Sequence, residues 1–196
     1  MKRYILLLTT LLSTTLILAI DANTTASKEM TVKQEGVKYI KLLGETLKNE
    51  LQTHMKADKT GLSAMGFCTA KADEITKEIN KKLPAYASVR RTALKTRNEN
   101  NLPDALDIKV MKDYEASIAA NTFMPTDIKV VQEGTTTRVY KSLVTQSVCL
   151  KCHGSNISKE IQGEITANYP KDEAVGFKEG SLRGMIVSEI ITVAAE

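Results

Sequence analysis

Two cysteines and a histidine stand close together in the run Cys149-Leu150-Lys151-Cys152-His153. Two thiols three positions apart can each add across one vinyl group of a haem and form a thioether bond. An imidazole directly after the second thiol can then coordinate the iron from one face. This order is typical of c-type haem attachment. We therefore expect Cys149 and Cys152 to hold one haem covalently, with His153 as the proximal iron ligand.

Two other chemistries use the same cysteine spacing. A Cys-x-x-Cys pair can form a redox disulfide of the thioredoxin type, but that site needs a βαβ context that this sequence does not contain. The pair can also supply half of a zinc site, which here would need Cys68 and His54 as further ligands. Because the chain has only three cysteines and two histidines, a covalent haem is the favoured interpretation.

The first residues predict export from the cytoplasm. Lys2 and Arg3 form a basic start, and residues 4–20 are an uncharged run of apolar, threonine and serine residues. A cleavage point after Ala22 or Ala26 is expected, although the run is nearly long enough to stay as an uncleaved anchor. We therefore expect a periplasmic protein, attached to the inner membrane only if that segment is retained.

Removal of residues 1–22 as a signal peptide leaves residues 23–196, the size of one ordinary domain with a sizeable core. The net charge of +4 becomes +3, because the removed segment carries two basic residues and one acidic residue. This mild charge lacks long basic runs, so nucleic acid is not expected as a partner. The sequence predicts a single domain.

Hydrophobic periodicity predicts a fold with helices and one sheet. Apolar side chains at steps of three and four predict a long amphipathic helix over 27–56, with His54 on its apolar face. A second helix is predicted over 63–83, with Ser63 as its N-cap and Cys68 on its apolar face. Further helices are predicted over 104–120 and 157–168, and strands over 86–93, 127–132, 135–144 and 184–193. A hairpin at Glu133-Gly134 joins the two middle strands, so we expect an α+β fold with an antiparallel sheet flanked by helices.

The second iron ligand separates electron transfer from ligand binding, because an iron with one open position admits small molecules. Cys68 and His54 are the main candidates. The methionines at positions 30, 55, 65, 111, 124 and 185 are also available, but a buried methionine usually fills a core. A third cysteine is a liability in an oxidising compartment unless it is buried or coordinated. We therefore rank Cys68 ahead of His54, with an open site third.

Four segments of the chain together resemble a known family. They comprise Gly66-Phe67-Cys68 through Ile75, Val89 to Asn98 with Pro103-Asp104, Cys149 to Gly154, and the closing run from Tyr169 to Gly184. On these residues the chain is similar to single-haem c-type, sensor-like domains of unknown function from cyanobacteria and proteobacteria. Such domains occur alone or as extracytoplasmic parts of signalling proteins. The resemblance implies a PAS-like antiparallel sheet, with His153 and the thiolate of Cys68 on opposite sides of the iron.

A basic run, formed by Arg90, Arg91, Lys95 and Arg97, lies in the second of these segments. On the resemblance, these residues supply cations for the haem propionates, since buried carboxylates favour charge-assisted partners. The alternative is a solvated basic strand edge, and the residues alone leave both interpretations open.

The sequence thus predicts an exported haem protein that senses redox state or a small diatomic gas. A periplasmic single-haem electron carrier is the alternative, because no output domain is visible. The expected partner is accordingly a small diatomic ligand or a redox partner protein. An enzyme is not expected, since no distal His-Arg pair is visible and two protein ligands would block the iron.

Overall fold

In the computed structural model of this chain, the fold is described for residues 18–192, with side chains from residue 31 onward. Four strands form one antiparallel sheet in the order β1-β4-β3-β2. The strands are β1 (Ala87–Thr92), β2 (Ile128–Glu133), β3 (Thr136–Val144) and β4 (Leu182–Ile191). The predicted hairpin joins β2 to β3, and the last strand of the chain lies between β1 and β3. The α+β fold with an antiparallel sheet is therefore confirmed.

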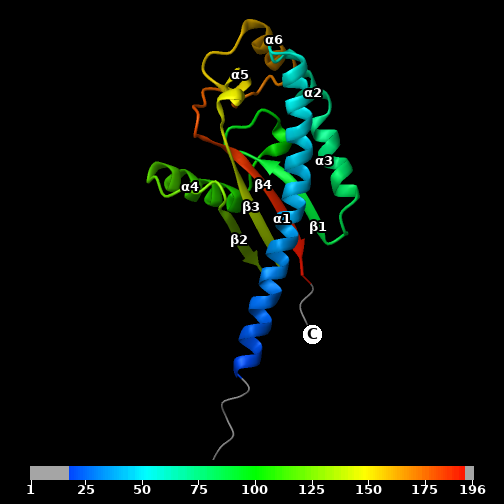
Figure 1. The fold of residues 1–196 in the computed structure, drawn as a ribbon, viewed down its shortest axis with the longest axis vertical. Helices are drawn as coiled ribbons and strands as arrows, with labels where there is room; N and C mark the ends of the chain where they lie inside the picture. The colour runs from blue at the N-terminus through cyan, green and yellow to red at the C-terminus, as the bar shows by residue number, and fades with distance from the viewer. Residues whose placement is uncertain (1–17, 193–196) are drawn as a thin grey trace, which may run out of the picture.

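Six helices pack around this sheet within the described residues (Figure 1). They are α1 (Leu18–Ala57), α2 (Leu62–Ala70), α3 (Ala72–Lys81), α4 (Ala105–Ala119), α5 (Leu150–His153) and α6 (Lys159–Asn168). Helices α1 and α3 cover one face of the sheet, and α4 covers the other. Helices α2, α5 and α6 gather beyond one end of the sheet, at the top of Figure 1.

The core follows the alternation of side chains along the strands. On the α1 face, Tyr39, Ile40 and Leu43 pack against Val139 of β3, with further strand residues around them. A Cβ on Gly36 would lie only 2.4 Å from Cγ2 of Val139, so a glycine lets α1 approach the sheet closely. The second core lies on the α4 face of the sheet, because adjacent residues of a strand point to opposite faces. Its buried members are Val110, Met111, Tyr114, Tyr140, Leu182, Met185 and Val187.

The single helix predicted over 63–83 is wrong, because the chain breaks at Lys71 into α2 and α3. Helix α2 packs against α1 and α6, whereas α3 packs against α1 and β1, and the break lets the two segments point in different directions. Ser63 is also not the N-cap. Helix α2 begins after Gly61, and Asp58 Oδ2 accepts the Ser63 N–H at 2.9 Å. The break at Lys71 depends on packing partners such as α6, far along the chain, whereas the start of α2 depends on the nearby residues Asp58 and Gly61. The apolar pattern encodes neither.

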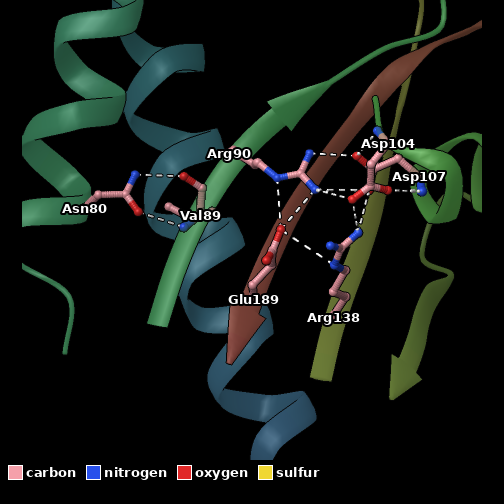
Figure 2. Close-up of polar contacts among 7 residues, drawn as sticks. All are labelled: Asn80, Val89, Arg90, Asp104, Asp107, Arg138 and Glu189. Carbon is pink, nitrogen blue, oxygen red and sulfur yellow. Dashed lines mark hydrogen bonds and ion pairs between the residues drawn. The ribbon is translucent and has the colours of Figure 1, made fainter. Parts of the chain in front are cut away.

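The free edge of β1 is covered by a side chain of α3 (Figure 2). Asn80 Nδ2 donates to the Val89 carbonyl and Asn80 Oδ1 accepts from the Val89 N–H, both at 2.8 Å. A strand edge with unpaired backbone groups invites pairing with another chain. The Asn80 amide satisfies both groups at this residue and blocks such pairing there.

A buried carboxylate joins α4 to the sheet (Figure 2). The Asp107 side chain is fully buried and accepts a bidentate pair of hydrogen bonds from Arg90, at 2.7 and 3.2 Å. Arg138 lies 3.6 Å from Asp107, and Glu189 Oε1 accepts from Arg90 Nε at 3.0 Å. Asp107 also forms a capping box with Asp104 at the start of α4. Two arginines, one on β1 and one on β3, thus balance the acidic groups of the α4 N-terminus and of β4, the strand between them.

Asp107→Asn is expected to lower the free energy of unfolding by about 3 kcal/mol, because it removes the one fully buried carboxylate that two partly buried guanidinium groups share. Glu115→Gln on the same helix removes only an exposed contact with Lys112 and is expected to cost less than about 0.5 kcal/mol. Urea denaturation of both variants measures the difference. Equal midpoints for the two would contradict a structural role for this cluster.

The predicted signal peptide over 1–22 falls mostly on residues 1–17, outside the described residues. Within residues 18–192, no helix combines the length and apolar character needed to cross a membrane.

Candidate haem-binding site

The Cys-x-x-Cys-His run forms a short helical segment directly after β3. A 3-10 turn over Ser147–Cys149 continues into α5 (Leu150–His153). Cys149 and Cys152 are three residues apart on this segment, which puts both thiols on one side of a helical turn. All three cysteines of the chain are free thiols. The two thiols are therefore placed to react with two neighbouring groups of one ligand.

The imidazole of His153 is held in one tautomer. Its Nδ1 lies 2.7 Å from the carbonyl oxygen of Ala174, which can only accept, so Nδ1 carries the proton. Burial lowers the pKa of His153 to about 3, and the positive charges of Arg183 and Arg97 add to this effect. The ring is therefore neutral at ordinary pH, with an unprotonated Nε2. A hydrogen bond of this kind on the distal nitrogen is typical of histidines that bind metals.

The segment before β4 fixes the position of α5. The Phe177 N–H donates to the carbonyl of His153 at 2.9 Å, and the Gly176 N–H donates to the carbonyl of Gly154 at 3.0 Å. The Phe177 ring meets the His153 ring edge to face, with 6.2 Å between centroids. Backbone and ring contacts thus lock the histidine against the segment over 172–177.

Arg97 and Asp172 form a buried ion pair beneath these contacts. Their Nε and Oδ1 atoms are 3.0 Å apart, and their side chains are only 9% and 6% exposed. Arg97 Nη2 also donates to the carbonyls of Cys152 at 2.7 Å and Ala174 at 3.3 Å. Asp172 Oδ1 accepts the Ala174 N–H at 2.9 Å. Arg97 is therefore a positioning residue for the Ala174 carbonyl that binds His153.

Cys68 lies at the same end of the fold, on α2. Helix α2 packs against α6, and Cys152 packs against the small core of Met65, Ile161 and Ile165 that the two helices share. Burial raises the pKa of the Cys68 thiol, the nearby Cys152 raises it further, and three arginines oppose the shift. The structure thus brings Cys68 next to the motif, although a long stretch of chain separates them.

The three arginines named from the sequence have different positions. Arg91 lies at the site and binds Asp73 at 2.9 Å through Nη2, while its Nε is buried without a hydrogen-bond partner in the described structure. Arg97 lies at the site but is bound to Asp172. Arg90 is not brought to this site, because its guanidinium binds Asp107 on the α4 side of the sheet. Neighbouring strand residues point to opposite faces, which separates Arg90 from Arg91.

His54 is occupied by other contacts. Its Nδ1 lies 2.8 Å from Ser63 Oγ, and its ring stacks on Phe67 with 5.2 Å between centroids. Across the part of the chain that the structure describes, no group of three or more His, Cys, Asp or Glu side chains is arranged to hold a metal ion. The zinc site considered from the sequence therefore finds no support there.

Three residues of this site were not named from the sequence as site residues. Asp172, Phe177 and Arg183 all fall in the closing run from Tyr169 to Gly184 that carried part of the family resemblance. Only their position in that run could have indicated a role in the site, since Asp, Phe and Arg are common residue types on protein surfaces or in cores.

Comparisons with known proteins show the family of this chain. The chain matches the Tll0287-like family (Tll0287) over residues 14–190 and belongs to that family. Among solved structures it is similar to the crystal structure of the cyanobacterial haem protein Tll0287. The sequence identity is 28%, the TM-score is 0.52, and the match covers 65% of this chain and 73% of that one. A search of curated proteins gives no significant match.

Gly154→Ala is expected to destabilise the protein by about 2 kcal/mol, because the new Cβ would lie 2.6 Å from the Leu150 carbonyl oxygen and force α5 to move. Gly163→Ala in α6 is the matched control. Its Cβ meets nothing within 4 Å, so higher helix propensity is expected to add about 0.5 kcal/mol of stability. Urea midpoints report both effects, and a stable Gly154→Ala protein would show that α5 tolerates displacement.

Proposed function

We propose that this chain is an exported haem protein that carries one covalent haem c on Cys149, Cys152 and His153. One observation carries the proposal. His153 directly follows two free thiols on one helical turn, and the Ala174 carbonyl holds the proton on its Nδ1, so its Nε2 is free to bind a metal. Addition of each S–H across a vinyl group forms one S–C bond and puts the hydrogen on the other vinyl carbon, so no oxidant is required. The haem named for Tll0287 in the same family supports this assignment.

The proposed second iron ligand is the thiolate of Cys68. This thiol is partly buried near Cys152 and within the field of three arginines, whereas His54 is bound to Ser63 and stacked on Phe67. Coordination to a metal cation deprotonates a thiol outright, even where burial alone keeps it neutral. Arginine charges around Cys68 further favour the thiolate.

A sensor of redox state or of a diatomic gas is the function that this arrangement supports best. A haem supplies an iron that exchanges one electron and binds a gas when a coordination position is open. Cys149, Cys152 and His153 lie on one short segment after β3, while Cys68 lies on α2. Coordination by Cys68 would couple the iron to the position of α2, and loss of that bond would leave the three other attachments intact. The antiparallel sheet with helices on both faces is compatible with a PAS-like domain.

The proposed location is the periplasm, with the protein held at the inner membrane only if residues 1–22 are not cleaved. The basic start and uncharged run of that segment support export. The proposed partners are a diatomic ligand or a redox protein, and we assign no catalytic role.

Absorption spectra of the purified periplasmic protein test the proposal. A pyridine haemochrome assay is expected to give one covalent haem for the wild type and for Cys68→Ala and His54→Ala. The ferric wild-type protein is expected to be six-coordinate and low-spin, and only Cys68→Ala should change its spectrum. The ferrous protein is expected to bind CO. An assay without covalent haem would reject the proposal, and a ferrous form inert to CO would reject gas sensing.

An electron carrier is the second candidate, favoured by a groove beside the motif. This open groove of about 500 Å³ runs between the end of α1 and the residues flanking Cys149. Lys56, Lys59 and Lys151 line it together with the apolar side chains of Met55 and Val148. A groove lined by basic and apolar side chains fits an acidic protein that docks near the motif.

If the groove receives such a partner, the double substitution Lys56→Glu and Lys59→Glu is expected to slow reduction by an acidic redox protein about tenfold at low salt. Raising the ionic strength should shrink the difference, because salt screens exposed charges. Lys109→Glu on α4 is the control and should leave the rate unchanged. Stopped-flow absorption measures the rates, and equal rates for all three proteins would exclude docking at this groove.

A further inference from the structure

Arg183 is a partly buried cation that forms no ion pair with a carboxylate among the described residues. It stands at the start of β4 beside the motif, and its Nη1 donates to the Lys95 carbonyl at 3.2 Å. Its Nε is buried and has no hydrogen-bond partner in the described part of the chain. The guanidinium carbon lies 5.3 Å from the centre of the Phe177 ring, which also contacts His153.

The acidic groups near Arg183 are already bound to other arginines. Asp73 binds Arg91 at 2.9 Å, and Asp172 binds Arg97 at 3.0 Å. Burial, reinforced by repulsion from Arg97, lowers the pKa of Arg183 to about 10, so the group keeps its charge at neutral pH. The end of the fold that holds the motif therefore has a partly buried positive charge that no ion pair balances among the described residues. Such a charge is costly unless an anion pairs with it.

We propose that Arg183 is an anion-binding residue that pairs with a carboxylate of the haem held by the motif. The planar guanidinium fork matches a carboxylate with two parallel hydrogen bonds, and Arg183 has its Nε free for one of them. Phe177 orients the fork, because its ring lies against both Arg183 and the edge of His153. This inference rests on the proposed function and gives Arg183 the role that the sequence suggested for Arg90, Arg91 and Arg97.

A free anion from solution, such as phosphate, offers the same chemistry. Arg183 differs from the other two arginines of the site in its ion pairing. Arg91 binds Asp73, and Arg97 binds Asp172 and two carbonyls, whereas no carboxylate among the described residues pairs with Arg183. The experiment must therefore separate a carboxylate that belongs to the haem from an anion that exchanges with solvent.

The test is the midpoint potential of the haem-loaded protein, measured by spectroelectrochemistry. A positive charge beside the haem favours the reduced iron, so Arg183→Gln is expected to lower the potential. Lys178→Gln removes an exposed charge from the same loop and is expected to leave the potential unchanged, because water screens it. An unchanged potential in haem-loaded Arg183→Gln would overturn the inference.

Replacing chloride by inorganic phosphate at constant ionic strength separates the two sources of the anion. If the haem carboxylate occupies Arg183, the wild-type potential should not respond to phosphate. A phosphate response in the wild type that disappears in Arg183→Gln would assign the residue to a free anion and reject the haem carboxylate.

Arg183→Lys keeps the assignment testable if Arg183→Gln does not accumulate with haem. Lysine retains the charge but loses the planar fork, so the propionate bending band in the resonance Raman spectrum is expected to shift. An unchanged band would overturn the inference.

The pyridine haemochrome assay on the wild type separates the two proposals. Absence of covalent haem rejects the proposed function. Covalent haem together with an unchanged potential and an unchanged Raman band in the Arg183 variants rejects only this inference.

Discussion

The buried ion pair between Arg97 and Asp172 is the interaction on which the geometry of the motif depends. Helix α5 has only four residues, too few to hold its own shape, so its orientation comes from outside. Arg97 reaches α5 through the Cys152 carbonyl, and with Asp172 it fixes Ala174 from both its N–H and its carbonyl side. The Ala174 carbonyl in turn selects the tautomer of His153. A break in this pair would leave a charge buried without a partner and would release the carbonyl that orients the proposed iron ligand.

The arginines of the basic run after residue 89 bind different carboxylates, because alternation along the strand points their side chains to different sides of the sheet. Arg90 points to the α4 side and neutralises Asp107, Arg91 points to the α3 side and binds Asp73, and Arg97 lies beyond the strand under α5. The family resemblance implied one shared role for them in binding propionates. The strand period predicts which side of the sheet each side chain faces. It does not predict which carboxylate each arginine binds there, because Asp107 and Asp172 come from other segments of the chain.

Much of the fold could be predicted from local patterns. The strands and the hairpin at Glu133-Gly134 follow from β-branched runs and turn residues, and the motif at Cys149 is legible without a fold. Other features depend on contacts between distant parts of the chain. The break at Lys71 arises because α2 and α3 pack on different partners, and Arg183 acquires its significance only when Asp73 and Asp172 are found bound to other arginines. The order of strands in the sheet belongs to the same class, since only the hairpin is local.

The central place of β4 bears on the order in which the molecule can be assembled. Ribosomes deliver the chain from its N-terminus, so the strand that separates β1 from β3 is made last among the four. Until it arrives, β1 lacks its strand neighbour in the described sheet, and pairings such as Ala87 with Ile190 wait for nearly the whole chain. The segment over 172–177, which fixes the position of α5, is also made late, just before β4. High contact order of this kind slows closure of a fold. In the proposed haem protein, Cys149 and Cys152 would belong to a chain whose sheet closes late, so covalent loading could precede completion of the sheet.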